Sequence, residues 1–197
     1  MADLARPALV CELKADALPG RVGILVGGSE VHLSEFVYDE EAVLSAVDPP
    51  PSRGVSGVIR RWEVSDAFPE DAVEHALAGR RAWTSIESEP SGLVNLARVQ
   101  GIRDDNNTVF ARTTIRSPEA RVQRLGLGFS DRAVVYLNGR PLFHGDDTYR
   151  SRDYRFLGSI GWFDELYLPL GAGDNDLVVA VSEDFGGWGV QARLIEA

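Results

Sequence analysis

A chain of 197 residues that is 44% hydrophobic and 9% aromatic is long enough to bury a substantial core and has a globular composition. Its formal net charge of −10 excludes a general nucleic-acid binder, because contacts to phosphates need a basic face, and it favours a neutral or cationic partner. The single cysteine, Cys11, excludes an intrachain disulfide and a cysteine-based zinc site, and no apolar run reaches the length that spans a membrane.

The N-terminal part of the chain predicts a small β-extension over residues 1–47. Ala8–Leu13 and Arg21–Val26 are short apolar runs separated by a Pro-Gly turn, and the stretch SEVHLSEFVY after them alternates as a half-buried strand does. Met1–Glu12 lacks the features of a signal peptide, so the chain as given is expected to be cytoplasmic; as a fragment of a larger secreted protein it would be secreted.

A proline-rich linker is predicted over residues 48–57, because three consecutive prolines, Pro49–Pro51, cannot lie inside a sheet and stiffen the chain. From residue 58 to residue 197 the pattern is almost entirely β. Strands are expected within 58–64 and at Trp83–Ser88, Leu93–Val99, Thr108–Arg116, Arg121–Phe129, Ala133–Leu137, Leu142–His144, Ile160–Leu170, Leu177–Ser182 and Val190–Ile195.

At most one short helix is expected. The stretch PEDAVEHALAG begins with Pro69, carries acidic residues in its first turn, and ends at Gly79. The dipeptide Asn138-Gly139 between two apolar runs is a strong hairpin signal, since a type I′ turn needs positive φ at both central residues. Many short strands without β-α alternation indicate an all-β fold, an antiparallel β-sandwich of the jelly-roll kind.

Several motifs of residues 58–197 are similar to those of the galactose-binding-domain-like jelly rolls, which include many carbohydrate-binding modules. They are RRWEVSDAF, SGLVNLAR, TVFARTTIRSP, LGLGFSDRAVVYLNGRPLFHG and LYLPLGAGDNDLVVAVSEDFGGWGVQARL. The resemblance implies a β-sandwich that binds sugars, accompanies a catalytic domain, or braces one. The stretch GRVGILVGGSEVHLSEFVY resembles the final strands of a concanavalin-like lectin domain, which implies that the extension is a remnant of such a domain.

The segment SEDFGGWG, between the last two predicted strands, has two interpretations. In the structural one, the glycines allow a sharp turn, and Trp188 covers the open end of the sandwich with its indole N–H bound to a carbonyl. In the functional one, Trp188 and Asp184 form part of a loop platform, where the ring stacks on a sugar and the carboxylate accepts hydroxyl protons.

The connection from His144 to Glu165 is long for a compact domain, and long loops often carry function. Its aromatic, arginine and aspartate residues suit a polyol, although they equally suit a braced loop or a protein interface. The predicted ligand-binding residues of both segments are Asp146, Tyr149, Arg150, Arg152, Tyr154, Trp162, Asp184 and Trp188.

Catalytic and cofactor motifs are absent from the sequence: it contains no nucleophile elbow, no Walker loop and no H-E-x-x-H, and no cofactor or metal site is predicted. His32, His75 and His144 lie far apart in sequence, and Asp104 to Asn107 read as a turn that needs no ion.

The leading functional prediction is a non-catalytic carbohydrate-binding-like or accessory module with a glycan ligand, without membrane or nucleic-acid partners. The first alternative is an assembly domain that pairs with a neighbouring domain or a second copy through the N-terminal edge strands. The second is a glycosidase or lyase that uses Glu87 or Asp184.

Overall fold

The computed structural model describes residues 55–99, 101, 105–148, 151 and 160–196. The chain divides into two units, Met1–Pro51 and Ser52–Ala197, and all described residues belong to the second. The strands predicted within residues 1–47 lie outside the described residues.

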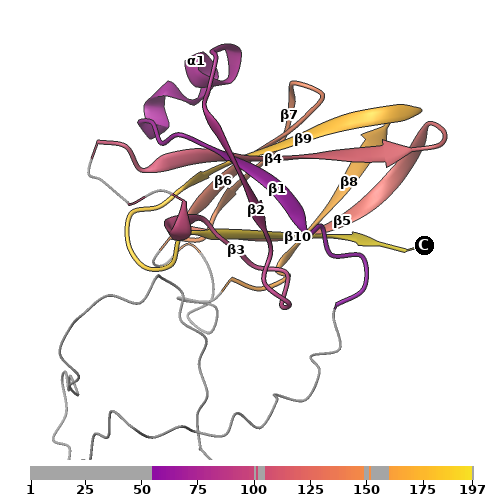
Figure 1. The fold of residues 1–197 in the computed structure, drawn as a ribbon. Helices are drawn as coiled ribbons and strands as arrows, with labels where there is room; N and C mark the ends of the chain where they lie inside the picture. The colour runs from indigo at the N-terminus through magenta and orange to yellow at the C-terminus, as the bar shows by residue number, and fades with distance from the viewer. Residues whose placement is uncertain (1–54, 100, 102–104, 149–150, 152–159, 197) are drawn as a thin grey trace, which may run out of the picture. The chain divides into compact units, whose positions relative to one another are not determined.

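The second unit contains two antiparallel sheets (Figure 1). The larger has the order β2-β1-β4-β9-β6-β7, and its strands are β1 (Arg61–Ser65), β2 (Trp83–Glu87), β4 (Thr108–Ser117), β6 (Arg132–Leu137), β7 (Arg140–Asp146) and β9 (Gly173–Ser182). The smaller has the order β3-β10-β5-β8, and its strands are β3 (Val94–Asn95), β5 (Arg121–Ser130), β8 (Asp164–Leu170) and β10 (Gly189–Ile195). The predicted all-β antiparallel sandwich is confirmed.

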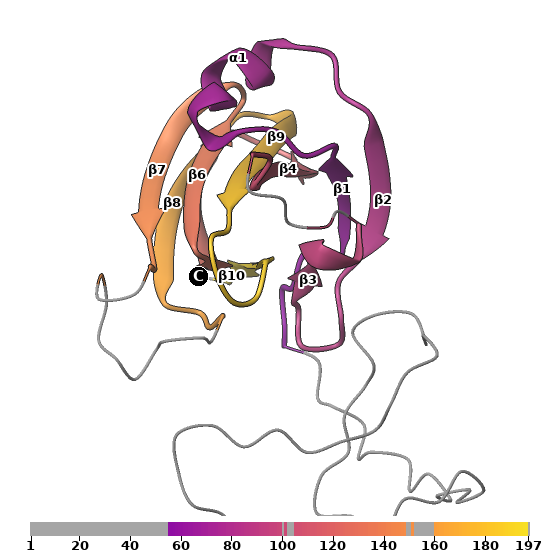
Figure 2. The ribbon, with the colours of Figure 1, turned by 90° about the vertical axis from the view of Figure 1, so that its left-hand side faces the viewer.

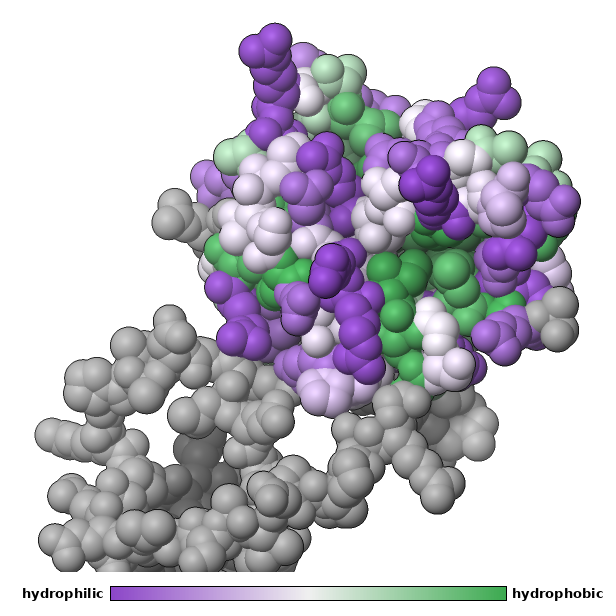
Figure 3. All heavy atoms as spheres, turned by 45° about the vertical axis from the view of Figure 1, so that its right-hand side comes forward, coloured by the Kyte–Doolittle hydropathy of each residue, from purple (hydrophilic) through white to green (hydrophobic). Residues whose placement is uncertain are grey.

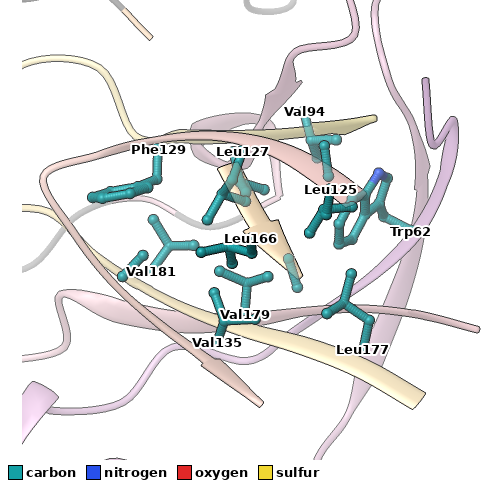
Figure 4. Close-up of a cluster of buried hydrophobic side chains, with 14 of the residues drawn as sticks. Trp62, Val94, Leu125, Leu127, Phe129, Val135, Leu166, Leu177, Val179 and Val181 are labelled. Carbon is teal, nitrogen blue, oxygen red and sulfur yellow. The ribbon is translucent and has the colours of Figure 1, made fainter. Parts of the chain in front are cut away.

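The main core lies between the two sheets and follows from the alternation of side chains along each strand. Figure 4 shows apolar side chains from both sheets pointing toward one another. They include Leu125, Leu127 and Phe129 of β5, Leu166 of β8, Val135 of β6, and Leu177, Val179 and Val181 of β9. At about 1.5–3 kcal/mol for each fully buried apolar side chain, this layer supplies most of the stabilisation.

A second apolar cluster covers one end of the outer face of the six-stranded sheet. The predicted helix forms there as a 3-10 turn, η1 (Glu70–Ala72), followed by α1 (Val73–Ala78), with Gly79 as its C-cap. Its apolar face packs on Phe68, Phe110 and the outer side chains of β6 and β9, and the Phe68 and Phe110 rings lie 4.7 Å apart. The helix is therefore held by burial of one face rather than by its own length.

Most predicted strand positions agree with the structure, and the Asn138-Gly139 hairpin is confirmed, with φ values of 51° and 74°. Two strands are shorter than predicted. The segment predicted as Leu93–Val99 leaves the sheet after Asn95, where the 3-10 turn η2 (Leu96–Arg98) buries Leu96 and directs its N–H to the Trp188 carbonyl at 3.0 Å.

The strand predicted from Ile160 begins only at Asp164, because residues 160–163 cross the outer face of the smaller sheet instead. Gly128 permits this crossing: a Cβ atom at this position would lie 1.9 Å from the Gly161 carbonyl oxygen. Gln191, the cross-strand neighbour of Gly128, donates its side-chain amide to the Ile160 carbonyl at 3.3 Å.

The surface turned toward the viewer in Figure 3 is mainly hydrophilic, with hydrophobic residues gathered in patches between charged ones. Within the described residues, no helix has the length and apolarity to cross a membrane, and no group of three or more His, Cys, Asp or Glu side chains is placed to hold a metal ion.

Candidate ligand site at the loop end of the sandwich

Several strand ends meet at one end of the sandwich. The loop between β9 and β10, yellow in Figure 2, turns there, toward the viewer. The cross-strand partners Thr108, Ser182 and Arg132 place the start of β4, the end of β9 and the start of β6 side by side at this end. Asp146, at the end of β7, is the next partner of Arg132. We call this region the loop end.

Arg132, at the start of β6, links the turn η1 to the loop that follows β9. Its guanidinium donates to both oxygens of Glu70 at 2.7 and 2.6 Å and to both oxygens of Asp184 at 2.8 and 3.0 Å. Asn107 also donates to Asp184, at 3.2 Å. Hydrogen bonds from Arg132 hold the pKa values of Glu70 and Asp184 below their usual range, and the two carboxylates raise the pKa of Arg132. The charge of Arg132 is therefore already neutralised within the protein.

Asp131 anchors the loop that follows β9. Its Oδ2 accepts the backbone N–H groups of Asp184 at 3.0 Å and Phe185 at 3.2 Å, and its Oδ1 accepts the Ser130 hydroxyl at 3.2 Å. The Ser130–Asp131 peptide bond is cis. Since a carboxylate that accepts two N–H groups fixes the backbone of both residues, the start of the loop has a defined conformation.

The loop presents an aromatic ring, but not the one that the sequence suggested. Trp188 is only 2% exposed, packs in the main core, and donates its indole N–H to the Val181 carbonyl at 3.0 Å. Its structural interpretation is thus confirmed, and its ring has no free face for a sugar, which corrects its place among the ligand-binding residues. Phe185 is 90% exposed and occupies the position expected of a stacking platform.

An open hollow of about 590 Å³ lies beside this loop, lined by Pro69, Glu70, Asp71, Asp105 and Asn107. Glu70 and Asn107 also belong to the network around Arg132 and Asp184, so hydrogen bonds connect the hollow to the loop. Carboxylate oxygens accept the hydroxyl protons of a sugar, and an amide both donates and accepts. An aromatic side chain with such groups beside it is the combination that a polyol ligand requires.

Glu183 lies beneath the same loop and is fully buried, with 0% exposure. Burial first, and the neighbouring charge of Asp131 second, raise its pKa to about 7. A carboxyl group with such a pKa beside a second carboxylate is typical of acid–base pairs in enzymes. Because no surface of Glu183 is accessible, however, it cannot reach a substrate in this conformation.

The structure brings together two of the residues singled out from the sequence, Asp146 and Asp184, on either side of Arg132. Asp146 accepts the backbone N–H and the hydroxyl of Thr148 at 2.9 and 2.6 Å, which lowers the pKa of Asp146. Four others lie outside the described residues: Tyr149, Arg150, Arg152 and Tyr154.

Trp162 is not part of the loop end. It lies over the outer face of the four-stranded sheet, where its ring lies 3.2 Å from the position of a Cβ atom on Gly92, with the Arg193 guanidinium 5.0 Å from its centre. The ring is half-buried in these contacts. The structure therefore places Trp162 on a different surface from Asp146 and Asp184.

A second, larger hollow, of about 800 Å³, lies on the outer face of the six-stranded sheet. Its charged side chains are paired across the strands, Arg112 with Glu63 at 2.9 Å and Arg61 with Glu87 at 3.8 Å. Among the described residues that line it, the one aromatic side chain, Trp62, is buried in the main core, so none of them presents an exposed ring for stacking.

Glu87 and Asp184 do not approach each other. Glu87 pairs with Arg61, and the register of β1 with β4 places this pair level with Thr114. Asp184 lies at the opposite end of β4, because it follows Ser182, which pairs with Thr108. Six strand residues, or about 20 Å, separate these levels. Paired carboxylates of a glycosidase lie within about 10 Å of each other, so these two residues do not form such a pair.

Sequence reasoning missed Phe185, Asp131, Arg132, Glu70 and Asn107 as members of one site. Two local signals were available. Along β9, Val179, Val181 and Glu183 alternate on the inward side, which indicates burial of Glu183. Phe185 precedes two glycines in a loop, where a large side chain has little to pack against. The pairing of Arg132 with Glu70, 62 residues away, carries no local signal.

No protein-family model matches the sequence, and no curated protein is similar to it. Among solved structures, the chain is similar to a β-glucuronidase from Ruminococcus gnavus, with 11% identity, a TM-score of 0.46, and coverage of 70% of this chain and 28% of that one. It is also similar to a β-glucosidase from Kluyveromyces marxianus in complex with glucose, with 16% identity, a TM-score of 0.46, and coverage of 77% and 18%. The chain thus spans less than a third of the length of these enzymes.

Proposed function

We propose that the chain is a non-catalytic carbohydrate-binding or accessory module of the galactose-binding-like jelly-roll kind, and that its glycan binds at the loop end. The observation that carries this proposal is the exposed ring of Phe185 on a loop whose Asp184 is hydrogen-bonded to Asn107, which lines a hollow of carboxylates and an amide. A sugar ring would stack on Phe185, while its hydroxyl groups donate to Glu70, Asp71 or Asp105.

The charge distribution supports a neutral or cationic glycan over an acidic one. Arg132 is the cation of the ion-pair network, and its guanidinium is already paired with the carboxylates of Glu70 and Asp184. Among the described residues, the hollow is lined by three acidic side chains and by no basic one. An acidic sugar would therefore meet repulsion without a free cation to offset it.

Replacing Phe185 with alanine is expected to weaken glycan binding at least about tenfold, equivalent to about 1.4 kcal/mol. The change should leave the melting temperature within a few degrees, because an exposed side chain contributes little to folding. A glycan array with neutral, acidic and amine-bearing oligosaccharides would identify the best-bound glycan, and calorimetric titration with that glycan would measure both affinities.

Tyr167→Ala is the matched control, because Tyr167 is also an exposed aromatic residue, at 60%, but lies on β8 in the other sheet. It should bind the glycan as the unmodified chain does. Equal weakening in both variants, or no glycan bound by the unmodified chain, would contradict the proposal.

A further inference from the structure

Glu183 is a buried carboxyl group whose burial is not offset by hydrogen bonds within the described part of the chain. It continues the inward-facing series of β9 after Val179 and Val181, and its backbone N–H donates to the Asn107 carbonyl at 3.0 Å, which fixes its direction. Neither carboxyl oxygen has a hydrogen-bond partner among the described residues. An ionised carboxylate in such a place is strongly disfavoured, whereas the neutral acid is tolerated.

The carboxyl group touches the support of the ligand loop. Its Oε1 lies 3.6 Å from the position of a Cβ atom on Gly186, so it sits directly beneath the middle of the loop. On its other side is Asp131, whose Oδ2 holds the N–H groups of Asp184 and Phe185. A negative charge on Glu183 would therefore repel the Asp131 carboxylate, which fixes the loop.

The charged groups that face Glu183 come from three segments. Asp131, between β5 and β6, and Asp184, on the loop, favour the protonated form, whereas Arg132 on β6 favours the ionised one. The Ser130 hydroxyl, whose hydrogen bond goes to Asp131 at 3.2 Å, lies near enough to Glu183 to favour its ionised form as well. Asp147, after β7, contributes a backbone N–H that donates to the Asp131 carbonyl at 2.7 Å. Burial and Asp131 prevail and raise the pKa of Glu183 to about 7, so the proton is lost near neutral pH.

We propose that the proton on Glu183 acts as a switch for the ligand loop: its loss releases residues 184–187 from Asp131. Once ionised, Glu183 repels the Asp131 carboxylate and also lacks the hydration that a charge requires. Water that enters beneath the loop relieves both the repulsion and the desolvation cost. The loop is the element that yields, because its residues are exposed and Gly186 and Gly187 give its backbone freedom. If the loop end binds glycan as proposed above, binding then weakens as the pH rises toward neutrality and levels off above it.

The test uses the full chain labelled with ¹⁵N and ¹³C and needs no glycan. The carboxyl carbon shift of Glu183 is expected to titrate with a midpoint near 7. From about pH 4.5, the ordinary pKa of a glutamate, up to this midpoint, the exchange protection of the Asp184 and Phe185 amides, corrected for intrinsic base catalysis, should fall by up to about tenfold per pH unit and then level off. In Glu183→Gln this fall should disappear, and in the matched control Glu87→Gln, on the edge strand β2, it should persist.

A Glu183 midpoint near 4.5, or amide protection that depends on pH equally in the unmodified chain and in Glu183→Gln, would overturn the switch. The carboxyl titration decides the question even if the glutamine variant does not fold. The switch and the proposed function fail separately: pH-dependent protection without glycan binding at any pH would leave the switch intact and refute the function. Glycan affinity that is constant across pH 6–8 while the loop opens would refute their coupling.

Discussion

Replacing Trp188 with alanine is expected to lower the free energy of unfolding by about 3–5 kcal/mol, the usual cost of removing a buried tryptophan. The indole ring fills the core between the sheets at the loop end, and its removal leaves a cavity there. It also leaves the Val181 carbonyl without the hydrogen bond that Trp188 donates at 3.0 Å. For a domain of this size, the loss corresponds to a fall of roughly 10 °C or more in melting temperature.

Urea denaturation followed by circular dichroism measures this change. Phe185→Ala is the matched control, because it removes an aromatic ring three residues away that is exposed rather than buried. Its free energy of unfolding should change by less than about 0.5 kcal/mol. A Trp188→Ala protein as stable as the Phe185→Ala protein would contradict the buried position of Trp188 in the core.

Replacing Glu183 with glutamine is expected to remove a pH-dependent loss of stability. The pKa of Glu183 is about 7 in the folded chain and 4.5 ordinarily, so below pH 4.5 the group is protonated in both states and costs nothing extra. As the pH rises from 4.5 to 7, the unfolded chain releases the proton while the folded chain retains it. The free energy of unfolding therefore falls, by about 3 kcal/mol in total, and the decline levels off above pH 7.

Urea denaturation at several pH values between 4.5 and 8 measures this difference. The unmodified chain should lose stability over this range relative to Glu183→Gln, and the gap between the two should grow with pH. Glu87→Gln, at an exposed position, serves as the control and should follow the unmodified chain. A gap that stays constant with pH would show that Glu183 titrates normally.

The sandwich could be predicted from sequence because its signals are local. The alternation of side chains in β4 and β5 marks their buried faces, the continuous apolar run of β9 marks a strand buried on both faces, and the Asn138-Gly139 turn marks its hairpin. The crossing of residues 160–163 over the smaller sheet was missed because it depends on Gly128. That glycine lies more than thirty positions earlier and looks like any other strand residue in the sequence.

The candidate site was only partly predictable, for a physical reason. Sequence reasoning selected the correct segment, SEDFGGWG, but could not decide which aromatic ring faces inward. The strand resumes at Gly189, and Trp188 enters the core immediately before it, so the exposed position falls to Phe185. The ion-pair network around Arg132 depends on contacts between residues 52 and 62 positions apart, and such contacts follow only from the register of the sheet.

The most direct test of the proposed ligand site maps the bound glycan by NMR. The best glycan from the array would be titrated into the ¹⁵N-labelled chain, and amide shift changes would be recorded residue by residue. The account predicts that the largest changes cluster at residues 184–187, Asn107 and Glu70. Changes centred instead on Arg61, Glu87 and Arg112, in the hollow of the six-stranded sheet, would contradict it.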